Sequence, residues 1–134
     1  MKRIVCISLF FGILSVVAGG LFWLGTYHES VFDEKVLAEI VKETVSKNYS
    51  DIHQAFKEIE KRLVAAYPRH IHLGEEWIFN SAGGFLSGMK LLHASLGEYI
   101  IFWGSAVPTI GMSGRHFATF HDWLISGKFT QWME

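Results

Sequence analysis

FLSGMKLLHASLGEYIIFW, residues 85–103, has the pattern of a β-hairpin. Two apolar and aromatic runs, residues 85–95 and 98–103, flank Leu96-Gly97. Runs bounded by a glycine-containing turn are typical of paired strands. Three more runs read as short strands, at residues 77–80, 116–125 and 129–133. Serial short strands favour a barrel or a sandwich, and five of them leave an open sheet edge.

The segment before these strands is helical in pattern. Residues 31–47 carry apolar side chains at helical spacing, with acidic residues near their start. A second helix follows, with Ser50 or Asp51 as its N-cap, and it must end before Pro68 because the residue preceding a proline disfavours helix. The sequence therefore predicts a helical connector over residues 31–67.

The first 25 residues are the most apolar part of the chain. Between Ile4 and Gly25 lie 22 residues without a charge, and Lys2 and Arg3 precede them. A helix of about 20 apolar residues spans the hydrocarbon core of a bilayer. The positive-inside rule then places the N-terminus in the cytoplasm and the following residues on the far side. Residues 1–27 are thus predicted to be a transmembrane anchor.

Two other interpretations of this segment remain open. A secretory signal peptide also begins with basic residues, and Val16-Val17-Ala18 resembles a cleavage site, although the apolar run is longer than the roughly 7–15 residues of a signal peptide. A buried helix of a soluble domain usually shows a polar stripe. This segment offers only Ser8 and Ser15 for such a stripe.

Composition excludes several classes of protein. The 134 residues are 50% hydrophobic and 19% charged, with a net charge of −1. A chain this apolar is not intrinsically disordered. It also lacks the basic excess of a nucleic-acid-binding protein. The single cysteine, Cys6, excludes an internal disulfide and a cysteine-built zinc site.

Two carboxylates stand within apolar sequence. Asp122 lies in His-Asp-Trp, and Glu98 precedes a run of aromatic and branched residues. In an apolar pocket such a carboxylate could exchange protons with a substrate or bind an ammonium group. On an alternating strand it could equally point outward to solvent. The residues alone leave both interpretations open.

Two short motifs add weaker hypotheses. His70 and His72, followed by Glu76, resemble the first metal motif of cupins. The motif's leading glycine is missing and no second histidine motif follows, so no metal site is predicted. Asn48-Tyr49-Ser50 has the form of a glycosylation site, which is meaningful only on the lumenal side of a eukaryotic membrane.

Four blocks in the second half of the chain closely resemble the sterol C8 isomerase and sigma-1 receptor family. They are FNSAGG at residues 79–84, LLHASLGEY at 91–99, SGRH at 113–116 and ISGKFTQW at 125–132. The stretch FWLGT at residues 22–26 also resembles the end of that family's single N-terminal membrane helix. The resemblance covers nearly the whole chain.

The resemblance implies an α+β protein of the endoplasmic reticulum, or of the inner membrane in a bacterium. It implies a transmembrane helix, a helical connector and, over residues 68–134, a partial cupin-like β-barrel. Family enzymes shift a sterol double bond from the 8 to the 7 position, which needs a proton delivered to one carbon and removed from another. The alternative is a receptor without catalysis that binds sterols and cationic amphiphiles. Neither activity implies a cofactor.

By position, the resemblance also assigns site residues. Asp122 matches the family's ligand-pocket aspartate, and Glu98 matches a glutamate at the start of a strand; these are the candidate catalytic carboxylates. Tyr99 matches a tyrosine that hydrogen-bonds the pocket's acidic group. The apolar pocket wall corresponds to Phe85, Met89, Leu91, Ile101, Trp103 and Phe120.

Two departures from the family pattern bear on function. The family continues beyond the position of Glu134 with more barrel strands and a glutamate that contacts the ligand's cation. Two interpretations stay open, a fragment of a longer protein and a truncated, inactive product. The receptor's GxxxG trimer motif reads here Gly104-Ser105-Ala106-Val107-Pro108. Pro108 replaces the second glycine. The expected partners are therefore a sterol or cationic amphiphile and a lipid membrane; a homo-oligomer stays open, but a trimer is not supported.

Overall fold

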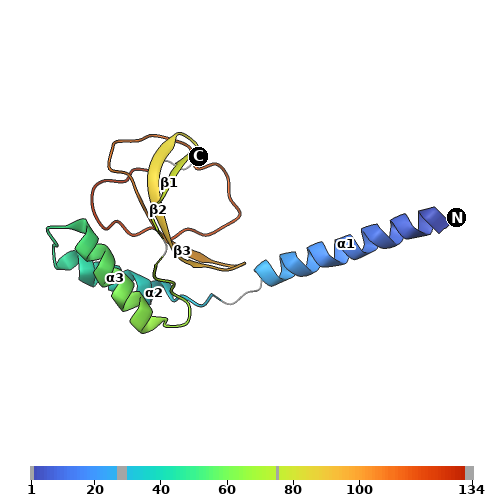
Figure 1. The fold of residues 1–134 in the computed structure, drawn as a ribbon, viewed down its shortest axis with the longest axis horizontal. Coiled ribbons are helices and arrows are strands. Elements are labelled where there is room, and N and C mark those ends of the chain that lie inside the picture. Colours follow the sequence, from blue (N-terminus) through green and yellow to red (C-terminus); the bar gives the residue numbers. More distant parts are fainter. Residues whose placement is uncertain (1, 27–29, 75, 132–134) are drawn as a thin grey trace. The chain divides into compact units, whose positions relative to one another are not determined.

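A computed structural model of the chain describes residues 2–26, 30–74 and 76–131, without the side chains of residues 2–10, 24–26 and 82. Over this part, the order of elements is α1, α2, α3, β1, β2, β3 (Figure 1). The predicted α+β class is confirmed. The chain divides into two units, residues 1–31 with 94–98 and residues 32–93 with 99–134.

The first unit contains α1, which runs over Lys2–Thr26 and confirms that the apolar N-terminal segment is helical. Large apolar side chains between Phe11 and Trp23 are exposed along it. Among the residues that the structure describes, no helix is both long enough and apolar enough to cross a membrane. The transmembrane role predicted for residues 1–27 is therefore not confirmed.

The second unit begins with the predicted helical hairpin, formed by α2 (Glu34–Ser46) and α3 (Ile52–Ala66). Asp33 caps α2, because its carboxylate accepts the N–H of Lys35 at 2.7 Å. α2 therefore starts later than the predicted residue 31. Asp51 caps α3 in the same way, so of the two predicted caps it is Asp51 and not Ser50 that serves.

Each of the two helices buries one face, which is made of small and branched side chains. α2 buries Ile40 and Thr44, and α3 buries Ala55, Ile59 and Leu63. These residues are four positions apart in each helix, which places them on one face. The hydroxyl of the fully buried Thr44 donates to the carbonyl of Ile40 at 2.8 Å, so its burial leaves no unpaired donor.

Charged side chains join the polar edges of the hairpin. Glu58 of α3 accepts Nζ of Lys47 and Nε of Arg62, both at 2.9 Å, and Arg62 also pairs with Glu43 of α2. The hydrogen bond from Lys47, followed by that from Arg62, lowers the pKa of Glu58 from its ordinary value of 4.5 to about 2. The ionised carboxylate is thus the centre of the network.

The lowered pKa of Glu58 predicts acid sensitivity of the hairpin. A carboxyl whose pKa is lower in the folded state stabilises it above the unfolded-state pKa, and the contribution is lost as pH falls toward the folded-state pKa. We expect the melting temperature of the full chain in detergent to fall between about pH 6 and about pH 3, and to fall less in Glu58→Gln. Glu39→Gln, an exposed change on α2, serves as the control. An equal fall in Glu58→Gln would contradict the network's role.

An antiparallel sheet follows, in the order β1-β2-β3, with β1 at Ile78–Ala82, β2 at Phe85–Ala94 and β3 at Tyr99–Gly104. These strands confirm three of the five predicted. Ala82 pairs with Phe85 across Gly83-Gly84, both of which have positive φ, as a two-residue hairpin turn requires. The backbone N–H of Met112 donates to the Gly83 carbonyl at 2.7 Å, and a side chain at Gly83 would collide with this segment.

One face of the sheet packs against α3. Lys90 of β2 pairs with Glu60 of α3 at 2.6 Å, and both side chains are largely buried. The ring of Phe102 on β3 lies 4.7 Å from that of Phe56 on α3, measured between centroids. Leu92, on the same face as Lys90, is fully buried. These contacts fix which side of each strand faces the helices.

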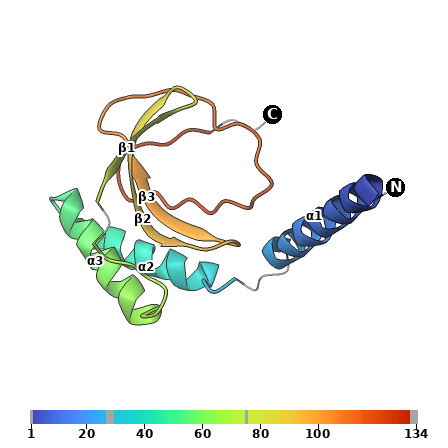
Figure 2. The same ribbon diagram turned by 45° about the vertical axis from the view of Figure 1, so that its right-hand side comes forward.

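The prediction of strands at residues 116–125 and 129–133 is wrong over the described residues. Over the described residues 105–131 the chain contains no strand and runs as an extended loop beside the sheet, orange to red in Figure 2. A strand needs a neighbour to pair its backbone groups. The described hydrogen bonds of this segment to the sheet are few and cluster around residues 83–86. The sheet is consequently open and the predicted barrel is not closed; residues 132 and 133 lie outside the description.

Candidate functional site

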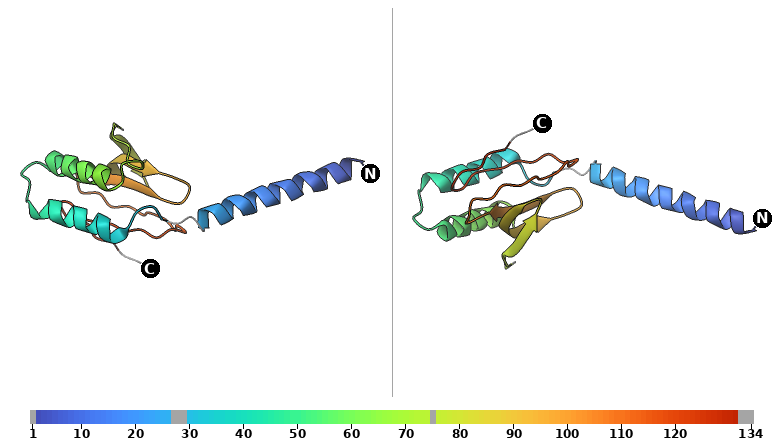
Figure 3. Two further views of the ribbon diagram at one scale, coloured as in Figure 1. Left: turned by 90° about the horizontal axis from the view of Figure 1, so that it is seen from below. Right: turned by 90° about the horizontal axis from the view of Figure 1, so that it is seen from above.

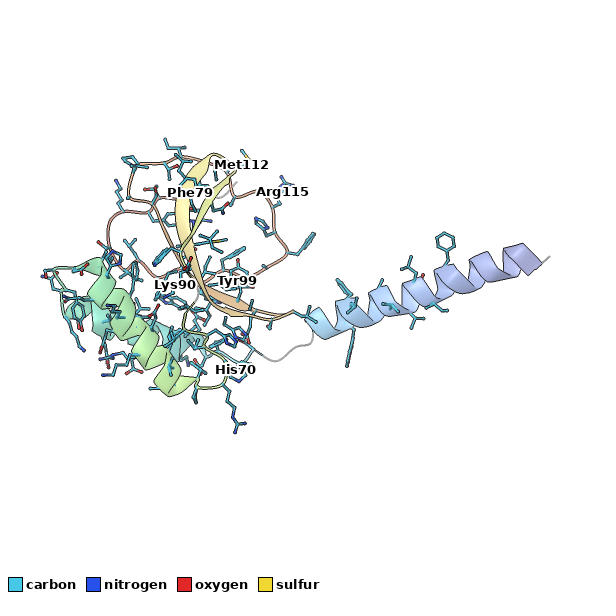
Figure 4. The ribbon with its side chains drawn as sticks, in the orientation of Figure 1. His70, Phe79, Lys90, Tyr99, Met112 and Arg115 are labelled. Atoms are coloured by element: carbon cyan, nitrogen blue, oxygen red, sulfur yellow. The ribbon has the colours of Figure 1, made fainter. Side chains whose placement is uncertain are left out.

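Six of the predicted pocket residues occupy alternate positions of β2 and β3. They are Phe85, Met89 and Leu91 on β2 and Tyr99, Ile101 and Trp103 on β3. Alternate residues of a strand point to the same face of a sheet. The neighbouring Lys90 and Phe102 contact α3, so these six side chains lie on the opposite face. Figure 4 labels Lys90 and Tyr99, one residue for each face. We call the six residues the open face.

The open face is apolar and partly accessible. Phe85, Met89, Leu91 and Ile101 are half-buried, while Tyr99 and Trp103 are 54% and 42% exposed. Apolar side chains that stay partly accessible are a common feature of binding sites. The hydroxyl of Tyr99 forms no hydrogen bond with any residue that the structure describes, so its predicted bond to an acidic group is not seen.

Trp103 connects the open face to the C-terminal segment. Its ring meets Phe85 at 5.9 Å and Phe129 at 5.6 Å, both nearly perpendicular. Edge-to-face ring pairs at these separations add a favourable interaction energy to that expected from the apolar area they bury. Phe129 was not among the predicted pocket residues. Its contact arises from the return of a distant segment, and nothing in the local sequence signals it.

Phe120 is placed differently from the other predicted pocket residues. It is 51% exposed, and its ring contacts His116 at 5.7 Å. Among the described residues it meets no aromatic ring of the open face. The structure therefore brings together six of the seven predicted pocket residues and leaves Phe120 on the loop.

Asp122 lies on the same loop and is exposed. It forms no hydrogen bond or ion pair with any residue in the described part of the chain. Its neighbour His121 pairs with Glu34, Nδ1 to carboxylate oxygen, at 3.1 Å and stacks on Trp123.

Glu98 belongs to the first unit and is engaged in hydrogen bonds there. One carboxylate oxygen accepts the Ser30 hydroxyl at 2.6 Å, and the other accepts the N–H of Val31 at 2.7 Å. The N–H of Glu98 is bound by the hydroxyl of Ser95 at 3.1 Å. Through these hydrogen bonds the Glu98 carboxylate links the β2–β3 turn to Ser30 and Val31, which follow α1. Glu98 belongs to the first unit and Asp122 to the second.

The histidines of the predicted cupin-like motif do not form a metal site. His70 packs against Phe32, and its carbonyl is bound to Nδ1 of His93 at 2.7 Å. His93 is buried, and this hydrogen bond gives it a structural role. In the part of the chain that the structure describes, no three His, Cys, Asp or Glu side chains gather as metal ligands would.

Comparison with known proteins identifies the family. The family model described as "ERG2 and Sigma1 receptor like protein" matches residues 5–134. The chain belongs to this family.

Its relatives include both branches of the family. The chain is 42% identical over 106 residues to "Sigma non-opioid intracellular receptor 1" of Danio rerio, covering 78% of this chain and 46% of the relative. With the receptor of Xenopus tropicalis it is 40% identical, over 84% of this chain and 50% of the relative. With "C-8 sterol isomerase ERG2" of Gibberella zeae it is 38% identical, over 72% of this chain and 41% of the relative. The chain thus spans about half the length of these curated relatives.

The hydrogen bond between the Glu98 carboxylate and the Val31 N–H predicts slow hydrogen exchange at Val31 in this family member. We expect Glu98→Ala to accelerate hydrogen exchange at the Val31 amide roughly tenfold, because a hydrogen bond to a charged group contributes about 1.5–3 kcal/mol and this one is partly exposed. Exchange measured by mass spectrometry on the full chain in detergent checks this. Glu39→Ala, an exposed glutamate of α2, should leave Val31 unchanged. Unaltered exchange in Glu98→Ala would show that the bond contributes nothing.

Proposed function

We propose that the open face binds apolar ligands, namely sterols and amphiphiles that carry an ammonium group. The observation that supports this most is the shared face of Phe85, Met89, Leu91, Tyr99, Ile101 and Trp103. Aliphatic side chains offer a flat apolar surface to a sterol ring system, at roughly 25 cal/mol per Å² buried. The exposed rings of Tyr99 and Trp103 offer their faces to a cation.

This activity is that of a binding protein without catalysis, of the sigma-1 receptor kind. Two observations favour it over an enzyme. The chain is 42% identical to the receptor of Danio rerio and 38% identical to the sterol isomerase of Gibberella zeae. Glu98 is already bound by two donors, Ser30 and Val31. Proton transfer needs an acid or base within reach of the reacting carbon.

Leucines on the two faces of β2 provide the test of ligand binding. Leu91 lies on the open face, and Leu86 lies on the opposite face of the same strand. We expect Leu91→Ala to weaken binding of a fluorescent sterol roughly tenfold, since burying a leucine side chain contributes about 1.5–3 kcal/mol. Leu86→Ala should change it less than about twofold. Titration of the full chain in detergent measures both. Equal effects of the two variants would contradict the proposal.

From the family resemblance we infer that Asp122 pairs with the ammonium group of a charged ligand. In solvent, an ion pair between this exposed carboxylate and a ligand ammonium contributes at most about 1 kcal/mol. We expect Asp122→Asn to weaken binding of a tertiary-amine amphiphile about two- to fivefold and to leave neutral sterol binding unchanged. Competition titrations at low salt check this. A matching loss for the neutral sterol would show that Asp122 acts through the fold and not through its charge.

The second candidate function is sterol Δ8–Δ7 isomerisation, and the 38% identity to the C-8 sterol isomerase of Gibberella zeae favours it. The double bond would shift by protonation of one carbon and loss of a proton from another, through a cationic intermediate. The full chain incubated with an 8-ene sterol in deuterated water tests it. An active enzyme yields the 7-ene product with deuterium at the protonated carbon. If the sterol is recovered unchanged, isomerisation is excluded and ligand binding remains the proposed function.

We also propose that residues 4–25 attach the chain to a membrane, with the N-terminus in the cytoplasm and the residues after α1 on the other side. The support is the 22-residue uncharged run after Lys2 and Arg3, and the exposed apolar side chains from Phe11 to Trp23. In the endoplasmic reticulum this orientation would put the second unit in the lumen. The modification experiment below tests the orientation.

A further inference from the structure

The loop between α2 and α3 presents the Asn48-Tyr49-Ser50 sequence to solvent. Lys47 is the C-cap of α2, and α3 starts at Ile52. Asn48 and Ser50 are both exposed, and the loop forms the outer end of the helical hairpin (Figure 3). An Asn-x-Ser sequence is a glycan acceptor only where the asparagine side chain is accessible on a surface loop. The structure meets that requirement.

The side chains of Asn48 and Ser50 have no structural task among the described residues. The backbone of Asn48 has φ of 49°, a left-handed conformation common in the residue that follows a helix, and its N–H donates to Val45. Its side-chain amide forms no hydrogen bond there. The N-cap of α3 is Asp51, so the hydroxyl of Ser50 is not needed for capping. The left-handed backbone explains an asparagine or a glycine at position 48, but it does not explain a serine two residues later.

We propose that Asn48 is an N-glycosylation site. The inference rests on the membrane orientation proposed above, which would carry this loop into the lumen of the endoplasmic reticulum. The organisms of the relatives named above are eukaryotes. The glycan donor is an oligosaccharide joined to a lipid through a diphosphate. The Asn48 side-chain nitrogen attacks the anomeric carbon of the first sugar, the carbon–oxygen bond to the diphosphate breaks, and the amide loses one proton as the lipid diphosphate leaves.

A glycan at this position is compatible with the rest of the second unit. The nearest ion pair, between Lys47 and Glu58, lies on the exposed polar edge of the hairpin and buries no apolar surface that a sugar would displace. The open face lies on the side of the sheet turned away from α3. We therefore expect the modification to add bulk and solubility without altering ligand binding.

Expression of the full chain in a eukaryotic cell tests the site. The wild-type chain should show a slower-migrating form that peptide N-glycosidase removes, and mass spectrometry should map the sugar to Asn48. Asn48→Gln and Ser50→Ala should abolish that form. Ser50→Thr should retain it, because threonine also completes the acceptor sequence. Sterol binding by Asn48→Gln should equal that of the wild type.

A second acceptor separates failure of the site from failure of the orientation. Lys128→Asn, placed in the Asn48→Gln background, generates an Asn-Phe-Thr sequence at an exposed position of the loop. If this variant is glycosylated and the wild-type chain is not, the chain reaches the lumen and the inference about Asn48 is overturned. If neither is glycosylated, the proposed orientation is wrong, and the inference about Asn48 is overturned with it. The binding function of the open face is tested separately, by the ligand titrations.

Discussion

The ion pair between Lys90 and Glu60 is the contact on which the assignment of the sheet's two faces depends. It places a charged residue of an otherwise apolar strand against α3, and the packing of Phe102 on Phe56 repeats the constraint one strand further. Because strand side chains alternate, every neighbour of these residues must turn to the other face. Removing one partner of a largely buried pair costs more than the pair contributes, since a charge is left without compensation. The register of the sheet on the helix is thereby well defined.

The same constraint gives the open face its character. Helix packing occupies Leu92 and Phe102, which are buried, and leaves Leu91, Ile101 and Trp103 half-covered. An apolar surface that stays partly accessible, edged by the ring pair of Trp103 and Phe129, is suited to an apolar ligand. The geometry of this face is therefore the observation on which the proposed binding function rests.

Sequence reasoning succeeded where the signal is local. Helical spacing of apolar residues, capping residues and apolar runs between glycine turns predict α2, α3 and the three strands to within a few residues. Residues 116–125 show why it failed elsewhere: their pattern suits a strand, but a strand exists only when a neighbour pairs with its backbone, and local sequence does not report the neighbour. Local sequence likewise does not predict two contacts between segments far apart in the chain. These are the contacts of Phe129 with Trp103 and of Met112 with Gly83. The partnership of Glu98 with Ser30 and Val31 belongs to the same class.

If the proposed function is right, apolar ligands contact the open face and not the helix-facing side of the sheet. The decisive experiment is to photolabel the full chain with a sterol that carries a light-activated diazirine and to map the labelled peptides. We expect labels on Met89, Leu91, Ile101 and Trp103 that excess unlabelled sterol suppresses. Suppressible labels confined to Leu86 or to α3 would contradict that expectation.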